Sequence, residues 1–280
     1  MMQPRLGNKA INRIGYGVMR LPGIREIPEN TELALRLLRE AVSLGVNVID
    51  TADIYGAGFA NRLISEALNP YPENLIISTK VGVKAGADGR PVPAATPDEI
   101  KATVERDLDN LGTPSLDLVF LRLPGGPLPD SGVPIHESME CLAELQASGV
   151  IKHIGLSSAS TEQIEAAKSV ASVAAVQNAL FIGNSESTDV LQLCESENIP
   201  FFAYFPLGMG MLIQKKIDLG PFAAAHQASK SQIALAWLLA LSPAVVPIPG
   251  TSNIEHLREN IAASNLTLSP SEVETLRNVA

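Results

Sequence analysis

The chain has 280 residues, of which 46% are apolar and 18% charged, and its formal net charge is −9. This composition supplies a large core and excludes a mainly disordered chain. The acidic balance argues against binding to nucleic acid, because affinity for phosphate comes from clustered lysine and arginine. We expect a cytoplasmic protein with no membrane contact, because no apolar run reaches the roughly 18 residues of a membrane span and the N-terminus lacks a signal peptide. Its two cysteines, Cys141 and Cys194, fall in predicted helices and are expected to be reduced structural thiols.

Short apolar runs typical of β-strands alternate with longer helical patterns along the chain. The runs are continuous and often β-branched, as in strands that are buried on both faces. There are eight of them, at residues 14–18, 46–49, 75–79, 116–121, 151–156, 173–176, 201–204 and 244–248.

The segments between these runs carry helix signals. Residues 31–44 place apolar side chains on one helical face, and Gly45 follows as a stop. A capping box, in which Ser or Thr is followed three residues later by Glu or Gln, marks the start of four predicted helices. The capping residues are Thr96, Ser160, Ser229 and Ser269.

The number and spacing of these units predict the fold. Eight strand–helix units give about 35 residues for each unit, which is the size of one βαβ step. We therefore predict a single (β/α)8 TIM barrel domain over residues 1–280. Gly7 and Asn8 suit a short N-terminal hairpin that caps the bottom of the barrel. A doubly wound open sheet is the alternative, weakened because the chain lacks a G-x-G-x-x-G fingerprint.

Polar side chains follow three successive strands, at the end of a barrel where catalytic groups lie. Asp50, Lys80 and Arg122 end the predicted second, third and fourth strands, and Tyr55 lies in the loop after Asp50. Alone, each has an ordinary structural role as a cap, a packing aromatic, an ion-pair partner or a rim charge. Together they indicate one acid–base site. We expect Lys80 to lower the pKa of Tyr55, and Asp50 to hold Lys80, so that Tyr55 can protonate a developing alkoxide.

Five motifs in colinear order resemble the aldo-keto reductase superfamily, and the resemblance runs from about residue 10 to the C-terminus. They read DTADIYG at residues 50–56, STK at 78–80, IKHIGLS at 151–157, YFPLG at 204–208 and IPGTSNIEHLREN at 248–260. The resemblance implies a (β/α)8 barrel that binds NADPH across its mouth without a Rossmann fold and reduces aldehydes and ketones. It also implies that Tyr55 is the general acid, with Lys80 and Asp50 as its catalytic neighbours.

The same resemblance implies a set of cofactor-binding residues. Ser157 and Gln177, with Ser158 or Asn178, would hold the nicotinamide amide, and Tyr204 would stack on its ring. Ser158 stands where the family usually has Asn. The other positions assigned to the cofactor are Gly17, Val18, Met19, Phe205, Pro206 and Ile248; Leu207 and Gly208 in the diphosphate loop; Gly250, Thr251, Ser252 and His256 at the 2′-phosphate; and Glu259 and Asn260 at the adenine.

Besides Ser158, two further positions depart from the family pattern. The fourth catalytic position, usually His, is Arg122, which offers fixed donors and a permanent charge to a carbonyl oxygen but relays no proton. The expected 2′-phosphate pocket has His256 and nearby Arg258 rather than a lysine at Gly250. NADPH is still expected in preference to NADH.

Arg122, RIGYGVM at residues 13–19 and FPLG at residues 205–208 are similar to a bacterial subgroup that includes NADPH-dependent pyridoxal reductases. The leading hypothesis is therefore NADPH-dependent reduction of a small aldehyde or ketone, with pyridoxal as one candidate substrate. The replacement of His by Arg122 favours an alternative, an NADPH-binding sensor or accessory protein with weak catalysis. A Schiff-base enzyme that uses Lys80 is disfavoured, because Asp50 would keep the amine charged. No metal site is expected. The loops at residues 123–134 and 205–221 are expected to shape the substrate pocket.

Overall fold

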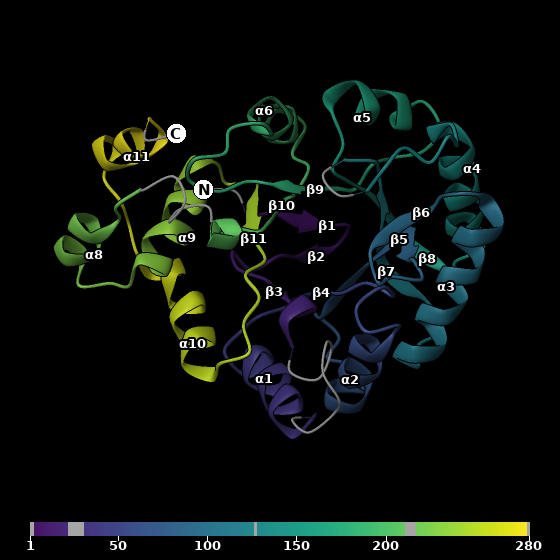
Figure 1. Cartoon of the computed structure of the whole chain (residues 1–280), viewed down its shortest axis with the longest axis horizontal. Helices are drawn as coiled ribbons and strands as arrows, with labels where there is room; N and C mark the ends of the chain where they lie inside the picture. Colours follow the sequence, from purple (N-terminus) through teal and green to yellow (C-terminus); the bar gives the residue numbers. More distant parts are fainter. Residues whose placement is uncertain (1–2, 22–30, 126–127, 211–216, 279–280) are drawn as a thin grey trace.

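The computed structural model describes residues 3–21, 31–125, 128–210 and 217–278. Within these ranges, eight parallel strands follow one another around a barrel in chain order, and helices ring them on the outside (Figure 1). The strands are β3 (Tyr16–Gly17), β4 (Val48–Asp50), β5 (Ile76–Ala85), β7 (Leu116–Arg122), β8 (Ile151–Ser157), β9 (Ala175–Ala179), β10 (Phe201–Tyr204) and β11 (Val245–Pro247). The prediction of a (β/α)8 barrel is confirmed.

The first and last strands of the barrel close on each other through backbone hydrogen bonds. Gly15 N donates to Pro247 O at 3.0 Å, and Gly17 N donates to Pro249 O at 3.2 Å. A Cβ atom on Gly17 would lie 2.7 Å from the carbonyl oxygen of Ile248, and glycine is the residue that permits so close an approach. The seam between β3 and β11 therefore depends on glycine.

Four of the described helices outside the barrel start at the capping boxes that the sequence predicts. All four predicted capping boxes are present, and Gly45 and Gly112 adopt left-handed conformations just after helices α1 and α3. The helices are α1 (Thr31–Ser43), α2 (Phe59–Leu68), α3 (Pro97–Leu111), α4 (Ile135–Ala147), α5 (Thr161–Lys168), α6 (Thr188–Glu197), α8 (Gly220–His226), α9 (Lys230–Leu241), α10 (Ile254–Ala262) and α11 (Pro270–Arg277). Cys141 on α4 and Cys194 on α6 are buried and free.

The predicted N-terminal hairpin, β1 (Arg5–Leu6) and β2 (Lys9–Ala10), lies across the centre of the ring of strands (Figure 1). Its Leu6 packs into an apolar cluster inside the barrel, which also holds Phe120 and Phe202 in edge-to-face contact at 5.6 Å. A second, larger cluster fills the layer between the strands and the helices. The barrel is therefore a packed core, and its polar groups gather at the C-terminal ends of the strands.

One hairpin was not predicted. Strand β5 continues beyond the expected residues 75–79 to Ala85 and pairs antiparallel with β6 (Pro91–Ala94). Strand β6 contains Pro91 and Pro93, and proline is tolerated in an edge strand because no ladder hydrogen bond has to be donated on its open side. The first strand is also shorter than the predicted residues 14–18, because its ladder with β4 involves two residues only.

Candidate active site

Asp50, at the end of β4, and Lys80, near the end of the part of β5 that pairs within the barrel, come together at the mouth of the barrel. Lys80 Nζ lies 2.7 Å from Asp50 Oδ2 and donates to the carbonyl oxygen of Thr51 at 2.8 Å. The other carboxylate oxygen, Oδ1, accepts hydrogen bonds from Ser78 Oγ at 2.9 Å and from Gln177 Nε2 at 2.7 Å. Asp50 is 3% exposed and Lys80 is 7% exposed. The carboxylate is thus held by donors from both β5 and β9, in a setting where charge-assisted hydrogen bonds are strong.

Tyr55 lies beside this ion pair, on the loop that connects β4 to α2. Lys80 Nζ is 5.2 Å from the centre of its ring. Burial raises the pKa of Tyr55, the positive charge of Lys80 lowers it, and the negative charge of Asp50 raises it, so that the pKa lies above its ordinary value. The sequence predicted a lowered pKa for Tyr55. That prediction is wrong in its net direction, because desolvation outweighs the effect of Lys80.

The charge state of Lys80 follows from the same contacts. Burial lowers the pKa of Lys80, but the attraction of Asp50 and Tyr55 and its hydrogen bonds raise the pKa by more. The amine therefore stays an ammonium ion at neutral pH. A Schiff-base mechanism needs a neutral amine as the nucleophile, and the amine of Lys80 is charged. The structure therefore agrees with the sequence in disfavouring a Schiff-base role for Lys80.

A cavity of about 390 Å³ opens beside Asp50 and Tyr55. Its wall comes from the loops after β3, β4, β10 and β11 and from the first turn of α10. The described lining residues are Gly17, Met19, Arg20, Asp50, Tyr55, Tyr204, Phe205, Pro206, Leu207, Met209, Gly210, Ile248, Pro249, Gly250, Thr251, Ser252 and His256. Most of the residues that the sequence assigned to a cofactor are thus brought together on one surface.

Several predicted residues lie outside that lining. Val18 is fully buried in the apolar core, and Asn260 is buried on α10. Glu259 is exposed on the same helix, and Gly208 is buried in a left-handed turn. Ser157, Ser158 and Gln177 lie at the mouth ends of β8 and β9, where Ser158 contacts Tyr204 and Gln177 contacts Asp50, two of the lining residues.

Ser157 Oγ and Gln177 Oε1, at the ends of these strands, are buried and have no hydrogen-bond partner among the described residues. Ser157 and Gln177 are directly paired in the register of β8 and β9. A hydroxyl can donate and an amide oxygen can accept, so the two atoms together match a ligand that carries a primary carboxamide. Leaving such atoms unpaired costs about 1–3 kcal/mol each, which a ligand would recover.

The residues beside them are already engaged. Asn178 uses its amide on the backbone of Ala159, accepting from the N–H at 3.0 Å and donating to the carbonyl at 2.8 Å. These bonds hold Ser158 in a left-handed conformation with φ of 59°. The Ser158 hydroxyl then lies 2.9 Å from the hydroxyl of Tyr204. Ser158 therefore fixes the ring of Tyr204, whereas Asn178 holds the turn.

Arg122 lies at the end of β7, and its side chain contacts the loop that follows this strand. It donates from Nη2 to the carbonyl of Gly125 at 3.0 Å and from Nη1 to the carbonyl of Leu123. Its side chain lines a second cavity of about 210 Å³ and is not in the described lining of the first. Burial lowers the pKa of Arg122, while Tyr204 and Tyr55 raise it, so its charge acts on both rings. Residues 126–127 and 211–216 of the two predicted pocket loops lie outside the described residues.

Arg20 is a lining residue that the sequence analysis missed. It ends the short 3-10 helix η1 (Val18–Arg20), and its Nη2 contacts Met209 Sδ at 3.0 Å. Arg258 was expected near this pocket, but it pairs with Glu40 at 2.8 Å and Glu255 at 2.9 Å instead. The signal for Arg20 was its position directly after the predicted cofactor residues of the first strand.

In the described part of the chain, no group of three or more His, Cys, Asp or Glu side chains is arranged to hold a metal ion. None of the described helices is long and apolar enough to cross a membrane.

Comparison with known proteins agrees with the geometry. A family model described as the aldo/keto reductase family matches residues 13–280. The chain is 41% identical over 279 residues to pyridoxine 4-dehydrogenase of Escherichia coli, covering 98% of this chain and 97% of that protein. It resembles the crystal structure of a thermostable aldo-keto reductase in complex with the inhibitor epalrestat, at 30% identity and a TM-score of 0.85 over 100% of both chains. It also resembles an aldo/keto reductase from Klebsiella pneumoniae in complex with NADP and acetate, at 26% identity and a TM-score of 0.82 over 98% of this chain and 93% of that one.

The buried ion pair yields a test of stability. Asp50→Asn leaves the ammonium of Lys80 buried without its partner, and we expect a loss of about 3–5 kcal/mol in the free energy of unfolding. Denaturant unfolding at pH 7 measures that loss. The double variant Asp50→Asn/Lys80→Met removes the stranded charge and is expected to recover most of the stability. A double variant less stable than Asp50→Asn would contradict the account of this pair.

Proposed function

The chain belongs to the aldo/keto reductase family, and on that premise we propose that it reduces a small aldehyde or ketone to the alcohol with NADPH. The observation that carries the proposal is a pair of buried atoms without a partner among the described residues, Ser157 Oγ and Gln177 Oε1. They lie next to the group formed by Asp50, Lys80 and Tyr55, because Gln177 also donates to Asp50. One side of the mouth is suited to bind a carboxamide, and the other side is suited to transfer a proton.

The residues present fit a nicotinamide cofactor. Ser157 would donate to the carboxamide oxygen, and Gln177 Oε1 would accept from its NH₂ group. The ring of Tyr204, held by Ser158, would lie against the nicotinamide ring. NADPH, when bound, supplies the hydride. The Klebsiella pneumoniae relative, which was crystallised with NADP, supports this choice of cofactor.

The cavity beyond Tyr204 would hold the rest of the cofactor. Arg20 and His256 are the basic side chains among the described lining residues, and they suit phosphate groups. The loop from Gly250 to Ser252 approaches β3 closely, and the Tyr16 hydroxyl donates to the carbonyl of Thr251 at 2.7 Å, which fixes this loop in place.

Tyr55 would act as the general acid. Its raised pKa keeps the phenol protonated at neutral pH, so that a proton is available for the oxygen of the reduced carbonyl. Lys80, 5.2 Å from the ring, would stabilise the phenolate that remains after the transfer. Asp50 keeps the ammonium of Lys80 at that place through the 2.7 Å ion pair. The chain's own part in the chemistry is therefore to store a proton and to stabilise the charge left by its departure.

We infer that pyridoxal is a candidate substrate of this site. The Escherichia coli relative is named pyridoxine 4-dehydrogenase and is similar to this chain over nearly its whole length. Arg122 supplies a permanent positive charge within electrostatic reach of Tyr55 and Tyr204. Such a cation suits the negatively charged oxygen of a pyridinol ring, and it would also polarise the carbonyl.

A second function is favoured by one observation. Arg122 donates to the carbonyls of Leu123 and Gly125 on its own loop and is not one of the described residues that line the first cavity. A site with this arrangement would suit a protein that binds NADPH as a sensor or accessory subunit. Tight NADPH binding with no turnover across a panel of aldehydes, pyridoxal included, would support this second function.

Removal of the Tyr55 hydroxyl tests the proposed role of this residue. We expect Tyr55→Phe to lower kcat for aldehyde reduction by about 10²–10⁴-fold, because the general acid is lost. The Kd for NADPH should change by less than about twofold, since no cofactor contact is assigned to the hydroxyl. Absorbance at 340 nm measures turnover, and quenching of protein fluorescence measures binding. Tyr71→Phe is the matched control, because the Tyr71 hydroxyl bonds to Leu111 O away from the site. Equal turnover in Tyr55→Phe and wild type would refute the assignment.

Replacement of Arg20 tests which cation holds the cofactor phosphates. We expect Arg20→Gln to weaken NADPH binding about tenfold, as the loss of one charge-assisted hydrogen bond predicts. Arg258→Gln is the control and should leave the Kd unchanged, because Arg258 is paired with Glu40 and Glu255. Fluorescence titration measures both Kd values. A larger loss of NADPH affinity in Arg258→Gln than in Arg20→Gln would contradict this assignment.

A further inference from the structure

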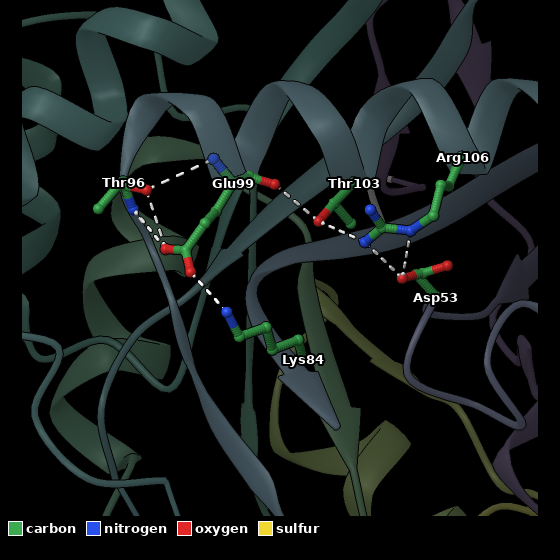
Figure 2. Close-up of polar contacts among 6 residues, drawn as sticks. All are labelled: Asp53, Lys84, Thr96, Glu99, Thr103 and Arg106. Atoms are coloured by element: carbon green, nitrogen blue, oxygen red, sulfur yellow. Dashed lines mark hydrogen bonds and ion pairs between the residues drawn. The ribbon is translucent and has the colours of Figure 1, made fainter. Parts of the chain in front are cut away.

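Helix α3 contacts the mouth of the barrel from the outside through two adjacent residues. The first is Arg106, whose Nε and Nη2 donate to Asp53 Oδ2 at 3.1 and 2.8 Å (Figure 2). Its Nη2 also donates to Thr103 Oγ1 at 3.0 Å, one turn back on the same helix (Figure 2). Asp53 lies two residues before Tyr55, so this contact ties the loop of the proposed general acid to α3.

The second residue is Asp107, which is fully buried. Its Oδ2 accepts from Thr79 Oγ1 at 2.7 Å, and its Oδ1 accepts from Asn61 Nδ2 at 2.5 Å. Asn61 on α2 accepts in turn from Thr51 Oγ1 at 2.7 Å. Both oxygens of the carboxylate are therefore acceptors, and one residue links β5, α2 and the end of β4.

The two threonines in this network are neighbours of the catalytic pair. Thr51 follows Asp50, and Thr79 precedes Lys80. Successive side chains of a strand point to opposite faces, so Asp50 and Lys80 face the mouth while Thr51 and Thr79 face the helices. The carbonyl of Thr51 also accepts from Lys80 Nζ at 2.8 Å. A change in the bonds of Asp107 would thus be transmitted through the backbone to both members of the ion pair.

We propose that Asp107 is a positioning residue: from the helix layer, its carboxylate fixes the ends of β4 and β5 and so holds Asp50, Lys80 and the loop of Tyr55 in register for proton transfer. The proposal rests on the proposed function, because proton transfer from Tyr55 is the step that needs this geometry. The carboxylate form is the active one. A protonated acid must donate from one oxygen, and the NH₂ group of Asn61 cannot accept that proton. The proton therefore goes to the Thr79 hydroxyl, which has to turn and give up its own donation to Asp107.

The environment of Asp107 makes this network sensitive to pH near neutrality. Burial raises the pKa of Asp107 to about 7, the hydrogen bond from Thr79 lowers it, and the charge of Asp53 raises it. The hydrogen bond from Asn61 and the positive charge of Arg106 also lower the pKa of Asp107, but by less than burial raises it. The charged groups that act on it are Asp53, from the loop after β4, and Arg106 of α3, while β5 and α2 contribute uncharged contacts. The carboxylate therefore forms as the pH rises through about 7.

Replacement of Asp107 by its uncharged isostere tests the proposal. Wild-type kcat should rise between pH 6 and pH 8 as the carboxylate forms. Asp107→Asn should lack that rise and show a kcat about tenfold lower at pH 8, with KM for the carbonyl changed less than about threefold, because positioning affects the chemical step. Asp109→Asn, on the exposed side of the same helix, is the matched control and should behave as wild type.

A second variant separates positioning from a purely structural role. Thr79→Val removes a hydrogen bond that stabilises the carboxylate, so the midpoint of the rise in kcat should move to higher pH. A residue that only supported the fold would change stability without moving that midpoint. An Asp107→Asn enzyme with wild-type kcat and an unchanged pH profile would overturn the proposal.

A measurement without turnover keeps the two proposals distinguishable. The pKa of Asp107 is higher in the folded protein than in the unfolded chain, so wild type should lose stability relative to Asp107→Asn as the pH rises from about 4 to about 7. Thermal unfolding across this range reports the difference. A constant difference would overturn the assigned titration even in an active enzyme. A wild-type protein that reduces no carbonyl would overturn the proposed function, and the positioning role with it, whatever the unfolding shows.

Discussion

The site depends on one buried ion pair at the barrel mouth, between Asp50 and Lys80. Removing two charges from water is costly, and the cost is met only when the partners are close and their other polar atoms are bonded. Here the Nζ–Oδ2 distance is 2.7 Å, and the second carboxylate oxygen accepts from Ser78 and from Gln177. Gln177 comes from β9, four strands along the sheet from β4, so its bond to Asp50 forms only because the sheet curls into a barrel.

The same burial explains the chemistry that the site can perform. Desolvation raises the pKa of Tyr55 and keeps its proton in place, while Asp50 keeps Lys80 charged. A charged amine beside a protonated phenol favours proton donation over Schiff-base formation. The unpartnered atoms of Ser157 and Gln177 lie at the ends of adjacent strands, behind the same mouth. The barrel thus places proton transfer and carboxamide binding around one carboxylate.

Much of the architecture and the core of the site follow from sequence patterns. The apolar runs and the capping boxes predict the strands and helix starts, because both signals are local. Asp50, Tyr55 and Lys80 are predicted together, because parallel strand ends meet at one edge of the barrel. What sequence reasoning missed depends on partners that are distant in the chain. Arg258 pairs with Glu40, 218 residues away, and Asp107 reaches Asn61 and Thr79 through packing that no local pattern records. The net pKa shift of Tyr55 was missed for a similar reason, since it depends on the depth of burial.

The most direct test of the central claim is NADPH oxidation by the wild-type protein, followed at 340 nm with pyridoxal beside a panel of simple aldehydes, and with NADH in parallel. The account predicts turnover that depends on the carbonyl compound, is faster with NADPH than with NADH, and includes pyridoxal among the substrates. Turnover of other aldehydes alone would remove pyridoxal and keep the reductase. Tight NADPH binding with no oxidation across the panel would contradict the account and favour the sensor function.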